Sequence, residues 1–190
     1  LRRALAAGHH LLVSHGLALE PLRANAGPAG RLGITLNLTA AYPASDRSED
    51  EAAAQRQDGF VNRWFLHPLY KGSYPEDMLE IFKGQMIEPQ ADDMALISRP
   101  FDFLGVNYYT RAVCKAARDG LLQLDMVKQP GEHTEMGWEV YPEGLYDTLM
   151  QVQRDYAPAS VYITENGAAF VDKLDGQGQV KDTRREAYLR

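Results

Sequence analysis

Glu165 is the residue best placed for chemistry, because it stands at the end of a short apolar strand. The strand, Val161–Thr164, is rich in β-branched and aromatic residues, and Asn166 and Gly167 end it. In α/β barrels and open α/β sheets the carboxyl ends of the strands carry the active site, since loops there enclose a pocket. The alternative is that Glu165 only caps the next helix or pairs with a surface arginine.

Three further polar residues fall near the ends of two other predicted strands. Asn37 lies near the end of the first, and Asn107 and Tyr109 lie near the end of the second. Because parallel strand ends converge on one pocket, we expect them to lie near Glu165. The alternatives are structural: Asn37 satisfies backbone groups of its loop, Asn107 forms a turn, and Tyr109 is a buried tyrosine bonded to backbone. Tyr108 should point to the opposite face of its strand.

The elements that position these residues alternate between helices and strands. Apolar residues at helical spacing predict a helix over residues 1–25, with Leu1, Leu5, Leu11, Leu12, Leu19 and Leu22 on one face. The order helix, strand, helices, strand, helix, strand, helix predicts parallel strands with right-handed crossovers. The strands are predicted over 32–38, 101–111 and 161–165, and the further helices over 49–66, 75–84, 90–98, 142–156 and 182–190.

Two local features refine this order. Ser48 and Glu51 form a capping box, which predicts that Ser48 caps the helix that follows. Residues 112–137 are predicted as a long polar connection, and a loop of this length usually has a binding role or is mobile. Trp64 suggests an aromatic platform for a ligand, but we expect it to pack into the core, because large aromatic side chains dominate core burial.

Composition excludes several partners. The chain has 190 residues, of which 45% are hydrophobic and 24% charged, and its net charge of −6 argues against nucleic acid, which requires a basic face. No apolar run approaches the roughly 18 residues of a membrane span. Cys114 is the single cysteine, so no disulfide can form within the chain. A reducing compartment is compatible with this, and we expect a cytoplasmic protein.

The histidines do not form a metal-ligand pattern. His9 and His10 are adjacent, so they point about 100° apart on a helix, and no cysteine or carboxylate joins them or His15 at ligand spacing. We expect no metal and no other cofactor.

Four segments in order resemble glycoside hydrolase family 1, the β-glucosidase family of (β/α)8 barrels. The strand-end segment resembles the family's nucleophile motif, and the others resemble its fifth strand with the following loop, its sixth strand and the segment before its seventh. The segments are Ile163–Gly167, Gly33–Leu38 with Tyr42–Ser45, Asp102–Thr110 and Met136–Leu145.

The resemblance implies a retaining β-glycosidase that hydrolyses terminal non-reducing β-D-glycosyl residues by double displacement. Glu165 would be the nucleophile, and the Tyr109 hydroxyl would donate to it and so favour its charged form. Asn107 would lie in the sugar pocket and Asn37 near its leaving-group side. The partner would be a small β-glycoside or oligosaccharide.

The chain departs from the family pattern in lacking the acid/base motif Asn-Glu-Pro. Glu20 and Glu88 each precede a proline, but neither follows an asparagine. The sugar contacts of the early strands and the Asn-Phe-Glu-Trp segment of the last strand are also missing. We therefore expect residues 1–190 to be one partial (β/α)8 domain, truncated at both ends and holding strands 5 to 7 with flanking helices. Its opened sheet should expose strand edges and apolar helix faces.

Other functions remain open. A non-catalytic carbohydrate-binding protein or a remnant barrel would keep pocket aromatics without the acid/base. A barrel isomerase or lyase would want a lysine base or a metal cluster at strand ends, whereas Lys115 and Lys173 fall in predicted loops. A purely structural domain would leave Glu165 unreactive.

Overall fold

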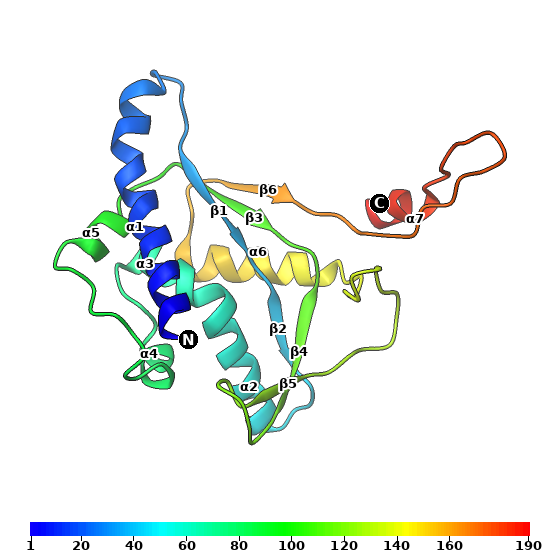
Figure 1. Ribbon diagram of the computed structural model, residues 1–190, viewed down its shortest axis with the longest axis horizontal. Helices are drawn as coiled ribbons and strands as arrows, with labels where there is room; N and C mark the ends of the chain where they lie inside the picture. The colour runs from blue at the N-terminus through cyan, green and yellow to red at the C-terminus, as the bar shows by residue number, and fades with distance from the viewer.

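A parallel sheet forms the centre of the computed structural model, which describes all 190 residues (Figure 1). Strand β3 (Phe103–Asn107) lies between β1 (Gly33–Asn37) and β6 (Val161–Glu165), and both pairings are parallel. The three predicted strands and their parallel direction are therefore confirmed. Because the strands run in the same direction, their carboxyl ends meet at one edge of the sheet.

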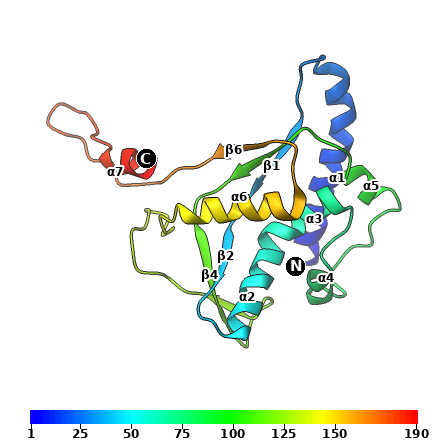
Figure 2. The same cartoon turned by 180° about the vertical axis from the view of Figure 1, so that it is seen from behind.

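Helices cover one face of this sheet. Figure 1 shows α6 passing behind β1 and β3, and Figure 2 shows it in front of them from the opposite side. The helices are α1 (Arg2–Asn25), α2 (Ser48–Asp58), a π-helical turn (Gly59–Arg63), α3 (Trp64–Lys71), α4 (Glu76–Ile81), α5 (Asp93–Ile97), α6 (Glu143–Tyr156) and α7 (Thr183–Tyr188). The main core joins sheet and helices through Leu12, Leu36, Leu38, Leu66, Leu69, Ile97, Leu104, Val106, Tyr108 and Val152.

Alternation along β3 separates the packed face from the open one. Leu104 and Val106 are completely buried in the main core. Gly105 lies between them in sequence, and a Cβ atom there would stand 2.3 Å from the Thr35 hydroxyl oxygen, so only glycine fits. Thr35 and Asn37 of β1 are exposed. The face away from the helices is therefore uncovered. It carries Gly105 and Thr35 and, beside them, the aromatic pair Phe103 and Tyr162, whose ring centroids are 5.0 Å apart.

A second sheet of three strands corrects the predicted long connection. Strand β4 (Arg111–Ala116) pairs in parallel with β2 (Ala40–Pro43) and antiparallel with β5 (Leu124–Met126). The predicted strand over 101–111 is thus too long, because β3 ends at Asn107 and Arg111 begins β4. Residues 112–137 are not only a connection. The packing responsible is tertiary, since Cys114 of β4 lies in a small core with Ala53 of α2.

Two helix predictions also need correction. Ser48 makes no capping hydrogen bond and is itself the first residue of α2. Asp50 instead accepts hydrogen bonds from the Ser45 hydroxyl at 2.5 Å and from the Ala116 amide at 2.8 Å. The helix predicted over 49–66 continues, through the π-helical turn, to Lys71. Gly72 ends it with a positive φ of 64°.

Burial on α1 is narrower than the predicted leucine face. Leu5, Leu12 and Leu19, spaced seven residues apart, are buried, whereas Leu11 and Leu22 are exposed. Helix α1 packs against the rest of the chain along one narrow stripe and has few neighbours on either side of it, which explains this pattern.

Trp64 packs in the core, as predicted. It is 3% exposed and its ring stacks on Tyr74 with the centroids 4.3 Å apart.

The two outer strands of the central sheet are open, as the sequence led us to expect. β1 and β6 each have a hydrogen-bonded neighbour on one side only. Tyr162 and Ile163 of β6 are both 50% exposed, although neighbouring residues of a strand point to opposite faces. Parallel strands are normally covered on both faces. β6 and the segment that leads to α7 accordingly extend away from the helices in Figure 1.

Leu104→Ala should destabilise the chain by about 2–5 kcal/mol, because it removes a completely buried side chain from the main core. Urea unfolding followed by circular dichroism measures this. Leu121→Ala is the control, because Leu121 is exposed and should change stability by less than about 0.5 kcal/mol. Equal effects of the two substitutions would contradict the assigned core.

Asp102 should make stability depend on acid pH. Its carboxylate accepts from the Leu32 amide at 2.7 Å and from Arg23 at 2.9 Å, and these bonds lower the pKa of Asp102 below its ordinary value. The stabilisation is therefore present above the unfolded pKa, about 4, and is lost as pH falls through the lower folded pKa. Urea unfolding at a series of pH values compares Asp102→Asn with the parent chain. The difference between their free energies of unfolding should shrink as the pH falls. A difference that stays constant would refute this role.

Candidate active site

Three of the predicted site residues stand in one row across the carboxyl ends of the central strands. In the sheet register Asn37 is the partner of Asn107, and Asn107 is the partner of Glu165. Each residue is the last of its strand, and a register shift after Val106 sets Asn107 opposite Glu165 instead of Thr164. The expectation that these residues lie close together is confirmed.

Two hydrogen bonds to the Tyr108 backbone fix the position of Glu165 along the strand direction relative to β3. The Tyr108 amide donates to the Glu165 carbonyl at 3.0 Å, and the Asn166 side chain donates to the Tyr108 carbonyl at 2.8 Å. A register shift between Val106 and Asn107 accompanies these bonds. The Tyr108 side chain points into the core, where its hydroxyl donates to the Tyr141 carbonyl at 2.7 Å, so its predicted structural place is confirmed.

Tyr109 follows this clamp, and its hydroxyl donates a hydrogen bond to the Glu165 carboxylate. The bond raises the pKa of Tyr109, and burial and the charge of Glu165 add to it. The same hydrogen bond orients the Glu165 carboxylate toward Tyr109. The alternative that Tyr109 is a buried tyrosine bonded to backbone is therefore wrong.

The two asparagines have different surroundings. Asn107 is buried, and its side-chain oxygen accepts from the Thr164 hydroxyl at 2.7 Å. Asn37 is exposed and its side chain makes no hydrogen bond within the chain. The loop after β1 is instead satisfied by Asn62, which accepts from the Thr39 amide at 3.0 Å and donates to its carbonyl at 2.8 Å. The amide of Asn37 is therefore available to a ligand.

Trp138 belongs to this site, although the sequence gave it no role there. Its ring centroid lies 5.1 Å from that of Tyr109 at an interplanar angle of 44°, and the side chain is 36% exposed. The signal available in the sequence was an aromatic residue directly after the predicted polar connection over 112–137. Thr164 and Asn166 were also missed as contacts of Asn107 and Tyr108, because such bonds depend on the strand register.

The site places one carboxylate beside a phenol, two amides and an aromatic ring.

The whole chain, residues 1–190, matches the family model of glycosyl hydrolase family 1. The chain belongs to this family. Beta-glucosidase A of Acetivibrio thermocellus is 42% identical over 196 residues, which cover 100% of this chain and 43% of that protein.

Solved structures of the family superimpose on this chain. A family 1 β-glucosidase from Thermotoga maritima superimposes with a TM-score of 0.93 at 39% identity, over 99% of this chain and 42% of that one. A β-glucosidase from the same organism in complex with castanospermine superimposes with a TM-score of 0.91 at 39% identity, over 99% of this chain and 42% of that one. This family 1 chain therefore spans less than half the length of these relatives.

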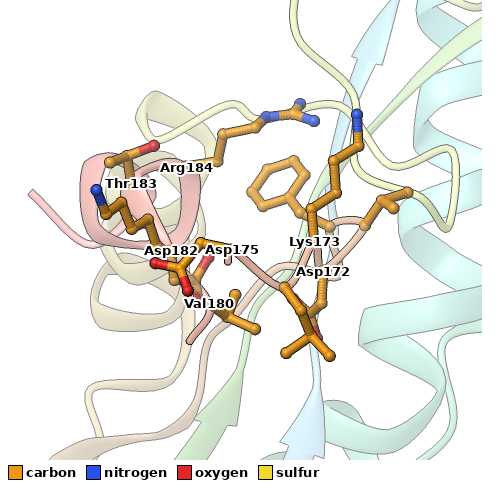
Figure 3. Close-up of a pocket in the computed structure, with 11 residues that line it drawn as sticks. Asp172, Lys173, Asp175, Val180, Asp182, Thr183 and Arg184 are labelled. Carbon is orange, nitrogen blue, oxygen red and sulfur yellow. The ribbon is translucent and has the colours of Figure 1, made fainter. Parts of the chain in front are cut away.

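The segment after Glu165 in this family 1 chain is held by two arginines. Arg185 donates to the carbonyls of Ala168 at 3.1 Å and Phe170 at 2.8 Å, and the Arg184 guanidinium lies 3.8 Å from the Phe170 ring centroid. An antiparallel bridge between Leu174 and Val180 closes the following residues into a hairpin. Figure 3 shows the pocket beside it, with Asp172, Lys173, Asp182 and Arg184 around it. None of the predicted site residues lines it.

The structure contains no group of three or more histidines, cysteines or acidic residues placed to hold a metal ion. None of the helices combines the length and apolar character needed to cross a membrane. His9, which the sequence did not favour as a ligand, is buried between Tyr74 and Asp93, to which its ring nitrogens bond at 2.9 Å each.

Glu165→Gln should lower the pKa of Tyr109 toward the ordinary tyrosine value of about 10, because the amide carries no charge to hold the phenol neutral. The measurement is an alkaline titration of ¹³Cζ-labelled tyrosines by NMR, with Tyr109 assigned through Tyr109→Phe. Glu143→Gln removes an exposed carboxylate from α6 and is the matched control. A Tyr109 titration that is identical in both variants would disprove the hydrogen bond.

Proposed function

We propose that this chain is the nucleophile-bearing part of a retaining β-glycosidase, a glycoside hydrolase that acts on O-glycosyl bonds. The observation that carries the proposal is the hydrogen bond from Tyr109 to the Glu165 carboxylate at the ends of two neighbouring parallel strands, in a family 1 chain. The substrate class is a small β-glycoside or oligosaccharide with a terminal non-reducing β-D-glycosyl residue, as β-glucosidase relatives suggest.

In this proposal Glu165 attacks the anomeric carbon while the bond from that carbon to the leaving-group oxygen breaks. A second carboxylic acid protonates the departing oxygen, and a glycosyl ester forms on Glu165. The same second group then deprotonates a water molecule, which attacks the anomeric carbon and releases the sugar and the free carboxylate. Two successive inversions at one carbon retain its β configuration.

The neighbours of Glu165 have distinct tasks in this scheme. Tyr109 keeps the carboxylate ionised and oriented for attack. Asn37 has a free side-chain amide for the leaving-group side of the pocket. Asn107, which is held by Thr164, would orient a sugar hydroxyl at the base of the pocket. The exposed ring of Trp138 offers an apolar wall on which a sugar face can stack.

We further propose that the chain supplies strands 5 to 7 of the eight in a (β/α)8 barrel, as one partial domain over residues 1–190. Two observations support this: both outer edges of the three-stranded sheet are free, and the chain covers 42–43% of the length of its relatives. No Asn-Glu-Pro tripeptide occurs in the sequence, so the acid/base would come from outside these residues.

A non-catalytic carbohydrate-binding or remnant barrel is the second candidate. The missing acid/base motif favours it for the isolated 190 residues. It would retain the amides and the aromatic ring for sugar binding, but no ester would form on Glu165.

Covalent trapping distinguishes the two functions. A 2-deoxy-2-fluoro-β-D-glucoside with a good leaving group should label Glu165 in the protein expressed with its native flanking sequence. The fluorine slows both formation and breakdown of the ester, whereas the good leaving group speeds formation alone, so the ester accumulates. Peptide mass spectrometry locates the added sugar. Glu165→Gln should remain unlabelled, and Glu143→Gln, which changes an exposed carboxylate on α6, should label normally.

Hydrolysis of an aryl β-glucoside by the isolated 190 residues should not exceed the rate in buffer, because no proton donor completes the site. Labelling elsewhere than Glu165, or none in the longer protein, would favour the non-catalytic candidate. Turnover by the isolated chain would refute the missing acid/base.

A further inference from the structure

Arg111 and Glu139 form a partly buried, two-bonded ion pair next to the candidate site. Arg111 Nε donates to Glu139 Oε2 and Arg111 Nη2 donates to Glu139 Oε1, both at 2.9 Å. The side chains are only 16% and 12% exposed. Surface ion pairs contribute little to stability, but a two-bonded pair shielded from water fixes the direction of both side chains.

The same guanidinium also joins segments far apart in the sequence. Its central carbon lies 3.5 Å from the ring centroid of Tyr141 and 5.4 Å from that of Tyr42 on β2. The two rings meet edge to face with their centroids 5.7 Å apart, and the Tyr42 hydroxyl donates to Asp147 of α6. Arg111 is therefore held at the first residue of β4 by contacts on several sides.

Glu139 transmits this position to Trp138, its neighbour in the chain. The Glu139 carbonyl accepts from the Thr110 hydroxyl at 3.0 Å. Trp138 is closed into a turn with Thr134, whose amide donates to the Trp138 carbonyl at 2.8 Å. The bonds from Thr110 and Arg111 to Glu139 thus tie this turn to the two residues that directly follow Tyr109.

The ring of Tyr109 is otherwise weakly constrained. It is only partly buried, and the other aromatic ring in contact with it is that of Trp138. Its hydroxyl must stay on Glu165, although the bonds between Cα and the ring can rotate. Packing against Trp138 limits that rotation.

We propose that Arg111 is a positioning residue. By holding Glu139 it seats the Trp138 ring on Tyr109, and so keeps the Tyr109 hydroxyl on the Glu165 carboxylate. Arg111 itself contacts neither Glu165 nor the Tyr109 hydroxyl. The value of this arrangement to catalysis rests on the proposed function, whereas the arrangement itself can be tested without substrate.

The first readout is ¹⁹F NMR of the chain labelled with 5-fluorotryptophan. The sequence contains 2 tryptophans, so the spectrum should hold one resonance from Trp138 and one from buried Trp64, assigned through Trp138→Phe. Arg111→Met removes the charge and both hydrogen bonds while keeping an unbranched stem. It should move the Trp138 resonance toward its position in the urea-unfolded chain and leave the Trp64 resonance in place.

Two further variants make the result specific. Arg111→Lys keeps the charge but cannot form the two-bonded pair, and it should shift Trp138 in the same direction by a smaller amount. Arg154→Met is the matched control, because Arg154 pairs with Asp155 on the surface of α6, with side chains 71% and 32% exposed. It should move neither resonance.

The second readout is the alkaline ¹³C titration of Tyr109. Arg111→Met should lower the pKa of Tyr109 part of the way toward its value in Glu165→Gln, because the phenol leaves the carboxylate for part of the time. A purely structural Arg111 would leave this titration unchanged in a folded variant.

The outcomes are decisive in each case. An unmoved Trp138 resonance, or an unchanged Tyr109 titration, in folded Arg111→Met overturns the proposal. If the Trp64 resonance also moves, Arg111→Met has lost its fold, and Arg111→Lys then decides by the same two criteria. Failure of sugar trapping together with these shifts would reject the glycosidase function and retain the positioning role.

Discussion

The parallel pairing of β3 with both β1 and β6 is the constraint on which this site depends. Leu104 and Val106 anchor β3 in the helix-covered core. Because β1 and β6 both pair with β3, its position sets where along the sheet these two strands end. The register then places the last residues of the three strands in one row. Two bonds to the Tyr108 backbone complete the alignment and bring the next residue, Tyr109, to the Glu165 carboxylate.

Its surroundings divide the site into a rigid side and an open side. The rigid side is built by β3, the Asn107–Thr164 bond and the ion pair of Arg111 with Glu139, all of which lie within this chain. The open side is the free edge of β6, where Tyr162 and Ile163 are half exposed. This family 1 chain spans 43% of the length of a β-glucosidase relative, and β6 has a hydrogen-bonded neighbour on one side only.

Local pattern was a good guide where one face or both faces of a segment were apolar. The three central strands, α1 and α6 could be predicted because their apolar and β-branched residues follow strand or helix patterns in the sequence. The pattern failed for β4 and β5, which carry Lys115 and Asp125 and are held by pairing with β2 and contact with α2. It also failed at Ser48, whose capping motif is local, while the actual bonds of Asp50 come from a loop and from β4.

By itself the sequence determined the residue types of the site, the strand ends that carry them and the resemblance to family 1. Those features are local, since a strand end and a motif are both encoded in a few consecutive residues. Only the tertiary structure decided that Asn37 is free while Asn107 is bonded, and that Trp138 and Arg111 belong beside Tyr109. These facts depend on register and on contacts between distant segments, which are set by the packing of the whole chain.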